Sequence, residues 1–325
     1  VRNLVASYPA DWVPDPPRLD TMGDKWQKGC CSASEQLHQQ RNARSVRRKH
    51  SPILSHRTCG RTIIPAPEMV RPKMVVNEMG GYFGGLVSCD NQFCPDCMGR
   101  FRTARRERIH AGLRGAREAG HESYFVTLTT ARASDGQAQI EAHAKAWRRF
   151  TRAIKYRLAK VGAKMHYVRA LDTTFQPFER DVFHNHFHFV AVVQGHVLDF
   201  AGLMGEQWKR AAQKGDLKVS MDAQDIQAVT DMTEGEVAAY GAKFWSMGKE
   251  LANFQQKSGK KSWNGAMSYG WMELMGLCHA GIPEAIATYR AHLLATAGKK
   301  TMVFSNGWKD LEELAPDIEE EEEET

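Results

Sequence analysis

The sequence predicts an α+β fold in which a central antiparallel sheet is flanked by helices. Three segments, 123–130, 165–175 and 183–193, are rich in β-branched and aromatic residues with period-two alternation, which is typical of strands. Residues 138–160 have helical spacing and separate the first two strands. Only a short link through Pro177 joins the last two strands, and so short a connection favours an antiparallel pair.

The composition is that of a globular protein with a basic body. Of the 325 residues, 42% are hydrophobic and 25% are charged, and no apolar run approaches the length that spans a membrane. The net charge of +6 includes six consecutive glutamates, Glu319–Glu324, so the rest of the chain carries +12. This charge predicts a polyanionic partner, of which nucleic acid is the commonest. The start of the chain has no apolar signal core, so we expect a cytoplasmic protein.

Residues 1–57 are expected to form a mostly irregular basic arm. Four prolines lie within the first 17 residues, and little periodic apolar pattern follows them. A basic cluster lies near the end of the arm: Arg41, Arg44, Arg47, Arg48, Lys49 and His50. We expect the arm either to lie along a phosphate backbone or to remain a solvated tail.

The next segment begins with cysteines that have the spacing of metal ligands. Cys94 and Cys97 form a Cys-x-x-Cys half-site, and Cys59 and Cys89 complete a set of four soft ligands for zinc. The chain has seven cysteines and no secretion signal, which favours reduced or metal-bound thiols over disulfides. The alternatives are free buried cysteines and a redox pair, although no strand leads into the motif as a redox site requires. His56 is a reserve ligand.

Two arginine-rich segments are candidates for nucleic-acid contacts. The first follows the cysteines and has helix-forming composition, and the second is the helix expected over 138–160. Guanidinium groups clustered on a helix neutralise backbone phosphates without reading base sequence. The predicted nucleic-acid-binding residues are Arg100, Arg102, Arg105, Arg106, Arg148, Arg149 and Arg152.

The strand over 183–193 carries three histidines, His184, His186 and His188, whose spacing places them on one face. At roughly 3.3 Å rise per residue, neighbouring imidazoles lie about 6.5 Å apart and the outer two about 13 Å apart. One ion can therefore bind an adjacent pair, and it needs a third ligand from a neighbouring strand. Asp172, near the end of the preceding strand, is the candidate carboxylate, and His184 is its competitor. The alternative is a histidine-rich strand that binds water or backbone carbonyls.

The rest of the chain is expected to be mainly helical. The apolar spacing predicts a helix over 198–214, a short strand over 217–229, and two or three packed helices from about residue 265 to residue 314. The methionines and tryptophans of this last region are most simply core residues. The glutamate run after it is expected to be disordered.

A site of two histidines and one carboxylate leaves coordination positions open, so its ion is expected to act as a Lewis acid.

A helix is expected to start at Thr233, because Thr233 and Glu236 form a capping box. Glu236, Tyr240 and Lys243 then share one face of that helix. Tyr240 can attack a phosphodiester if the metal withdraws charge from the phosphate and Lys243 favours the phenolate. Glu236 can instead activate water and end the cycle by hydrolysis, although capping alone also explains it.

The ordered combination of these motifs resembles the HUH endonucleases, and within them the rolling-circle replication initiators of bacterial plasmids. The matching residues are the run Phe-Val-Thr-Leu-Thr at 125–129, the His186-Phe187-His188 core, and Tyr240 with Lys243 in a late helix. The Cys-x-x-Cys before an arginine-rich helix, the strand 169–172 and the run 289–308 extend the resemblance to roughly residues 58–314.

The resemblance implies a sheet of the HUH nuclease type, a Mg²⁺ or Mn²⁺ ion, and cleavage of single-stranded and hairpin origin DNA in the bacterial cytoplasm. It implies a 5′-phosphotyrosine on Tyr240, a free 3′-hydroxyl, a host helicase and polymerase as partners, and a possible oligomer. By the same resemblance, His186 and His188 bind the metal and Lys243 is the companion of the tyrosine. Asp172 lies where relatives usually carry glutamate, and the substitute ligand is His184.

Two other interpretations compete with a replication initiator. An HUH relaxase or transposase shares the chemistry but recognises other DNA, and a non-catalytic zinc-dependent DNA-binding protein uses its cysteines and histidines only structurally. The expected domains are the basic arm (1–57), a zinc segment with an arginine-rich helix (58–118), a nuclease domain (119–250), a helical C-terminal region (251–316) and an acidic tail (317–325).

Overall fold

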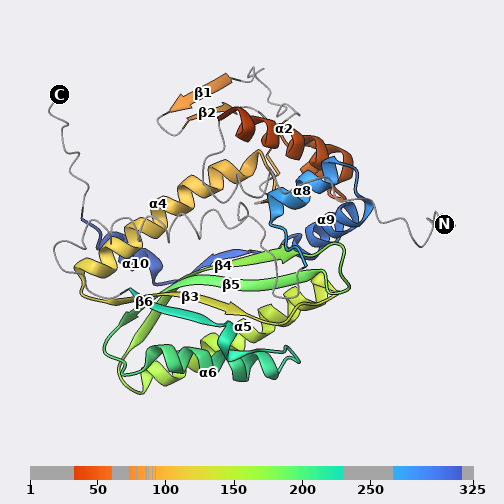
Figure 1. The fold of residues 1–325 in the computed structure, drawn as a ribbon. Helices are drawn as coiled ribbons and strands as arrows, with labels where there is room; N and C mark the ends of the chain where they lie inside the picture. Colours follow the sequence, from red (N-terminus) through yellow and green to blue (C-terminus); the bar gives the residue numbers. More distant parts are fainter. Residues whose placement is uncertain are drawn as a thin grey trace.

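The computed structural model describes residues 33–60, 73–77, 80–84, 86, 88–89, 91, 93–229 and 266–316. Within these residues, five strands form an antiparallel sheet in the order β6-β3-β5-β4-β7. They are β3 (Glu122–Thr129), β4 (Lys164–Phe175), β5 (Phe183–Gln194), β6 (Asp225–Val229) and β7 (Met302–Phe304). Helices lie on both faces of this sheet (Figure 1). The expected α+β fold with a central antiparallel sheet is confirmed.

The centre of the sheet is the β4–β5 hairpin, whose two strands have 12 residues each. The run 190–193 of β5 is fully buried, because β5 pairs with strands on both sides and helices cover both faces. A slip of one residue would move these apolar side chains to the wrong face, so burial sets the register. In that register Asp172 pairs with His186 and Thr174 with His184.

One face of the sheet is covered by α5 (Gly136–Ala159) and α6 (Phe200–Gln213), which lie below it in Figure 1. Asp135 caps the start of α5 by accepting a hydrogen bond from a backbone N–H three residues on. The apolar stripe of α5 faces the sheet, where the ring of Trp147 lies 5.1 Å from the ring of Phe189. The basic side chains of α5 therefore point away from the sheet.

The opposite face is covered by α4 (Cys97–Glu118), α8 (Trp271–His279), α9 (Pro283–Thr296) and α10 (Trp308–Glu313). Glycines on α4 allow α10 to cross it closely. A Cβ at Gly112 would lie 2.5 Å from the Trp308 ring, and a Cβ at Gly115 would lie 1.8 Å from the carbonyl oxygen of Leu311. The indole N–H of Trp308 donates to the carbonyl of Arg108 at 3.1 Å, which anchors the crossing.

One hydrophobic core joins this layer to the sheet. It includes Ile109 of α4, Val190 of β5, Leu274 of α8 and Leu293 of α9. Strand β7, which the expected all-helical C-terminal region did not include, adds an edge to the same sheet through β4. The segments expected as separate domains from residue 58 to residue 316 therefore contribute to a shared core.

The expectation of an irregular arm is wrong for its second half. Residues Ala33–His50 form helix α2, and Leu54–Thr58 form the short helix α3. Ala43 and Val46 are each 1% exposed and belong to the core, and Arg47 of the same helix is also buried, so these side chains pack α2 against the rest of the protein. Residues 1–32 lie outside the described residues.

Two smaller elements complete the described structure. Strands β1 (Lys73–Asn77) and β2 (Gly80–Gly84) form a separate antiparallel pair that the sequence patterns did not predict. A 3₁₀ turn over Met221–Ala223 leads into β6. In the described parts of the chain, no helix is both long enough and apolar enough to cross a membrane.

Candidate metal centres

Asp172, His186 and His188 come together on the face of the sheet that packs against α4, α8 and α9. The pairing of Asp172 with His186 brings the carboxylate of β4 beside the two imidazoles of β5. Asp172 Oδ2 lies 3.0 Å from His186 Nε2 and 3.5 Å from His188 Nε2. The three candidate ligand atoms all lie within 4.8 Å of one another. This is a possible metal site of two nitrogens and one carboxylate oxygen.

Neighbouring groups hold these ligands in place. His188 Nδ1 shares a hydrogen bond of 3.0 Å with the hydroxyl of Thr127, which leaves its Nε2 toward the carboxylate. Asp172 Oδ1 accepts a hydrogen bond from the backbone N–H of Thr173 at 2.8 Å. Asp172 is only 3% exposed, and a buried carboxylate requires a cation or donors around it. A divalent cation between the three residues meets that requirement.

His184 faces a different partner. Its Nε2 lies 2.8 Å from the hydroxyl of Thr129. Burial, together with the neighbouring His186 and Arg132, lowers the pKa of His184 to about 3. Of the two candidates for a third ligand, the structure brings Asp172 and not His184 against the histidine pair.

A β-bulge lies beside His184. Thr129 of β3 pairs with His186, and the next pair across the same two strands is Ala133 with Phe183. Between these two pairs the β3 side of the chain has three residues, 130–132, and β5 has two, so one residue is added on the β3 side, as in a β-bulge. Bulges of this kind redirect a side chain next to a functional site.

The bulge carries Arg132, which the sequence analysis missed. The side chain of Arg132 is half-buried, and its Nη2 lies 3.5 Å from the hydroxyl of Ser268. Its Nη1 is buried and has no hydrogen-bond partner among the described residues. Nothing in the run Thr-Thr-Ala-Arg-Ala marks this arginine as special, because only the strand register brings it next to His184.

Tyr240, Lys243 and Glu236, the predicted nucleophile and its companions, lie outside the described residues. Their assignment stays a prediction.

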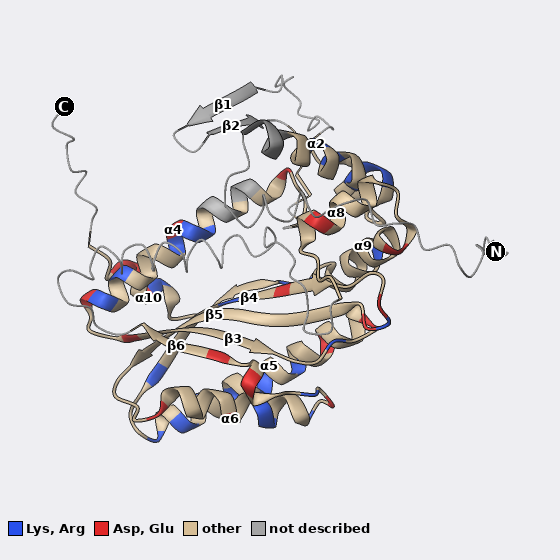
Figure 2. Ribbon diagram, viewed as in Figure 1, with Lys and Arg blue, Asp and Glu red and all other residues tan. Residues whose placement is uncertain are grey.

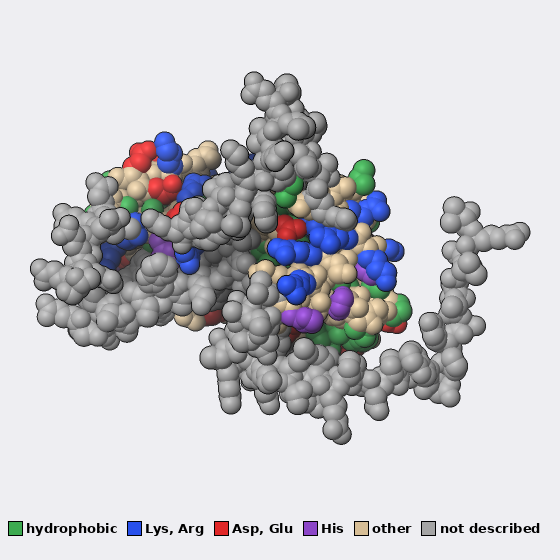
Figure 3. Space-filling model, turned by 90° about the horizontal axis from the view of Figure 1, so that it is seen from above, with side chains coloured by type: hydrophobic (Ala, Val, Ile, Leu, Met, Phe, Trp, Pro, Cys, Tyr) green, Lys and Arg blue, Asp and Glu red, His purple; other side chains and the backbone are tan. Residues whose placement is uncertain are grey.

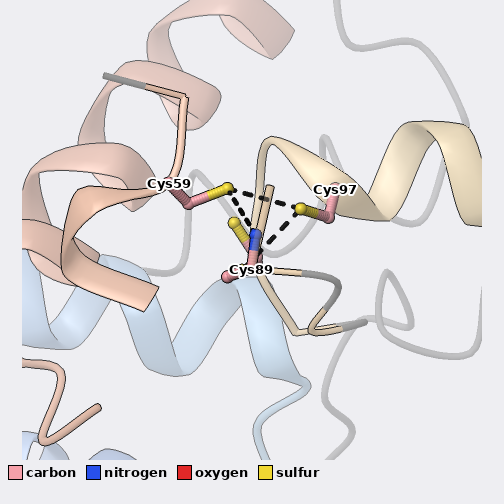
Figure 4. A group of neighbouring side chains, drawn as sticks. Cys59, Cys89 and Cys97 are labelled. Atoms are coloured by element: carbon pink, nitrogen blue, oxygen red, sulfur yellow. Dashed lines mark hydrogen bonds between the residues drawn. The ribbon is translucent and has the colours of Figure 1, made fainter. Parts of the chain in front are cut away.

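The four predicted cysteine ligands form a second candidate metal site. Cys59 follows α3, Cys89 and Cys94 precede α4, and Cys97 is the first residue of α4. Their sulfurs lie within 4.8 Å of one another, with Cys59 and Cys97 3.4 Å apart. Figure 4 shows Cys59, Cys89 and Cys97 pointing toward a common centre. Four converging sulfurs without a disulfide fit a tetrahedral metal ion.

His56, the reserve ligand, is not part of this group. It is fully buried, and its Nδ1 lies 2.9 Å from the hydroxyl of Ser51. Four cysteines already complete a tetrahedral set, so no position remains for the imidazole.

Arg47 of α2 reaches the cysteine cluster from the side. It is 0% exposed, and its guanidinium donates to Cys94 Sγ at 3.1 Å and to the carbonyl of Cys59 at 2.9 Å. Asp96 accepts from both Arg47 and Arg44, so one carboxylate faces two cations. A buried guanidinium needs a compensating anion, and Asp96 supplies one negative charge that Arg47 shares with Arg44. Thiolates bound to a metal would add negative charge beside Arg47, so the surroundings also fit a metal-bound cluster.

The predicted nucleic-acid-binding arginines divide between the two faces of the sheet. Arg105 and Arg106 lie on α4, where Arg105 sits over the ring of Phe101 at 5.1 Å. Nothing is described for the side chains of the other two predicted residues of α4, Arg100 and Arg102. The remaining three predicted residues are exposed on α5, on the side of the sheet away from the histidine site: Arg148, Arg149 and Arg152. The structure does not bring these three to the candidate metal ion.

Comparison of the chain with protein-family models, with curated proteins and with solved structures found no match.

Proposed function

We propose that this protein is a replication initiator of the HUH type, which nicks and rejoins single-stranded origin DNA with a tyrosine nucleophile. The observation that carries the proposal is the convergence of Asp172, His186 and His188 on one face of an antiparallel sheet. Such a site holds a Mg²⁺ or Mn²⁺ ion through three protein ligands and leaves positions open for phosphate oxygens.

The proposed reaction is a transesterification. The Tyr240 oxygen attacks a backbone phosphorus, a bond forms between them, and the bond from phosphorus to the 3′ oxygen breaks. The products are a 5′-phosphotyrosine and a 3′-hydroxyl, and attack by a 3′-hydroxyl reverses the step and rejoins the strand. When bound, the metal withdraws charge from the phosphate oxygens. Lys243 favours the phenolate form of Tyr240, and Glu236 activates water if the cycle ends by hydrolysis.

Arg132 fits this chemistry as a phosphate ligand. Its half-buried guanidinium has an N–H without a partner among the described residues, and it lies near His184 at the edge of the site. Guanidinium groups bind phosphate oxygens through paired hydrogen bonds. We assign Arg132 to a phosphate of the single strand that runs through the site.

The cysteine cluster is proposed to hold a structural Zn²⁺ with no open position. Single-stranded and hairpin origin DNA is the proposed substrate, and a host helicase and polymerase are the proposed partners. A relaxase or transposase would share the chemistry, and the DNA that is cleaved distinguishes them.

The test is formation of a covalent adduct. Wild-type protein, Mn²⁺ and a labelled single-stranded origin are expected to give a protein–DNA band that survives denaturation, and Tyr240→Phe is expected to abolish it. No adduct with the wild type, or an undiminished adduct with Tyr240→Phe, would contradict the proposal and favour a non-catalytic DNA-binding protein.

A further inference from the structure

Helices α2 and α3 present a set of cations that have no carboxylate partner within the described part of the chain. Four of these side chains are exposed and form no ion pair within the described residues: Arg41, Arg48, Lys49 and Arg57. The sequence from 33 to 60 contains one acidic residue, Glu35. Figure 2 shows basic residues along the end of α2, and Figure 3 shows basic side chains gathered over this part of the surface. We call this surface the α2 basic face.

The basic face continues onto α9. Arg290 is exposed, and its Nε donates to the carbonyl of His50 at 3.0 Å, which ties the end of α2 to α9. Burial and the neighbouring charges of Lys49 and Arg290 lower the pKa of His50. Cations of α2 and α9 therefore lie next to one another.

The two sides of α2 have different roles. Arg44 and Arg47 point inward to Asp96 and the cysteine cluster, whereas Arg41 and Arg48 are exposed. At about 1.5 Å rise per residue, Arg41 and Arg48 are two turns and about 10.5 Å apart on the outward side. The buried arginine thus holds the helix against the cysteine cluster while the exposed cations face solvent.

The types of side chain on the α2 basic face indicate which form of nucleic acid it binds. No Phe, Trp or Tyr occurs between residues 33 and 60, so α2 and α3 offer none of the large aromatic side chains on which the unpaired bases of a single strand stack best. It offers long cationic side chains on a helix, which contact the phosphates of a duplex without reading its sequence. The charge complementarity therefore favours duplex DNA over a single strand.

We propose that the α2 basic face binds the phosphate backbone of duplex DNA beside the nicked strand, and that the metal-bound cysteine cluster fixes this face through Arg47. The choice of DNA as the polyanion rests on the proposed function, whereas the link between the cysteine cluster and α2 does not. The histidine site and the α2 basic face then contact two different parts of a hairpin origin.

The first experiment measures duplex binding against salt concentration. The triple variant Arg41→Gln, Arg48→Gln and Lys49→Gln is compared with the wild type by fluorescence anisotropy of a labelled hairpin stem. The salt slope is expected to fall by about 0.9 for each lost phosphate contact, or by about 2 to 3 in all. The matched control removes three charges elsewhere, with Lys299→Gln, Lys300→Gln and Lys309→Gln, and is expected to keep the wild-type slope.

Adduct formation on a short, fully single-stranded oligonucleotide is measured in parallel and is expected to be unchanged in the triple variant. An unchanged slope in the triple variant, or an equal loss in the control, overturns the proposal. Tighter α2-dependent binding of duplex RNA or poly-glutamate than of duplex DNA also overturns it. If the wild type forms no adduct yet its duplex affinity depends on the α2 basic face, the proposed nicking function is contradicted, whereas duplex binding by the α2 basic face is supported.

The second experiment tests the link to the cysteine cluster. Arg47→Met is expected to release zinc to a chelator faster than the wild type and to bind duplex DNA as weakly as the triple variant, whereas Arg47→Lys is expected to show a smaller loss. Circular dichroism checks that the variant is folded. Chelating zinc from the wild type is the independent measurement and is expected to give the same loss of duplex affinity. Zinc retention and full duplex affinity in Arg47→Met, or full duplex affinity after zinc removal, overturn the link.

Discussion

Asp172 illustrates how one residue gains its role from its cross-strand neighbour. In the sequence it is 14 residues before His186, and in the hairpin it is the paired residue. Its Oδ1 is already bound to a backbone N–H, so Oδ2 faces the two imidazoles. Replacing Asp172 with asparagine therefore removes the negative charge of the site while keeping the size and shape of the side chain.

The variant Asp172→Asn is expected to weaken Mn²⁺ binding by more than about 100-fold, since even changes outside the ligand shell cost 10- to 100-fold. Titration of Mn²⁺ followed by electron paramagnetic resonance measures this directly. His184→Gln is the control, because the imidazole of His184 bonds to Thr129 and is not one of the three converging ligands. Equal loss in the two variants would mean that His184 also binds the ion.

A second prediction concerns Arg132. Arg132→Ala is expected to lower kcat/KM for nicking by about 10- to 100-fold, because a hydrogen bond to a charged group contributes about 1.5–3 kcal/mol. Arg180→Ala, which removes an exposed arginine from the β4–β5 turn, is the matched control and is expected to change it little. Steady-state kinetics with a single-stranded oligonucleotide measure kcat/KM for both variants. An equal loss of kcat/KM in the two variants would show that Arg132 does not bind the phosphate.

At the scale of elements, the crossing of α4 and α10 depends on a close backbone approach. Gly115→Ala places a Cβ against the Leu311 carbonyl, and the resulting overpacking is expected to lower the free energy of unfolding by about 1–3 kcal/mol. Gly276→Ala in α8 adds a Cβ into open space and is expected to raise it by about 0.5–1 kcal/mol. Urea denaturation measures both. A destabilised Gly276→Ala would show that helix propensity is not the deciding effect there.

Helix α5 also carries a buried imidazole that couples folding to pH. His143 is 0% exposed, its Nε2 lies 2.7 Å from the hydroxyl of Thr130, and burial lowers its pKa to about 3. The unfolded chain takes up this proton near pH 6.5, whereas the folded chain does so only near pH 3. The contribution of His143 to stability is therefore fully present above pH 6.5 and is lost as the pH falls toward 3.

In this window His143 is expected to make the free energy of unfolding fall by about 1.4 kcal/mol per pH unit. His143→Gln should remove that part of the slope between pH 6 and pH 4, as followed by urea unfolding. The same substitution at the exposed His279 is the control. A slope unchanged by His143→Gln would show that the imidazole is protonated in the folded protein.

At the scale of the whole molecule, the sheet separates two basic surfaces. The exposed arginines of α5 lie on one side of the sheet, and the histidine site and α2 lie with the helices of the other. A DNA strand at the histidine site therefore cannot also lie along α5 unless it passes around the edge of the sheet. The two candidate metal sites belong to the helical layer of α2, α4, α8 and α9 and to the face of the β4–β5 hairpin that it covers.

The sequence by itself determined the elements whose signals are local. Period-two alternation identified β3, β4 and β5, a short link made the last two an antiparallel pair, and cysteine spacing identified the four converging sulfurs. It missed α2, because the apolar pattern of this helix is weak: among its described side chains the buried ones are Ala43, Val46 and the charged Arg47.

Only the tertiary structure decided which distant groups meet. The choice of Asp172 over His184, the bulge that brings in Arg132 and the burial of Arg47 against Cys94 all depend on register and packing. These relations join residues 14 to 61 positions apart, for example His186 with Asp172 and His188 with Thr127. The local pattern made Asp172 a candidate but did not decide between it and His184, because the register is fixed by burial of the whole sheet between two helical layers.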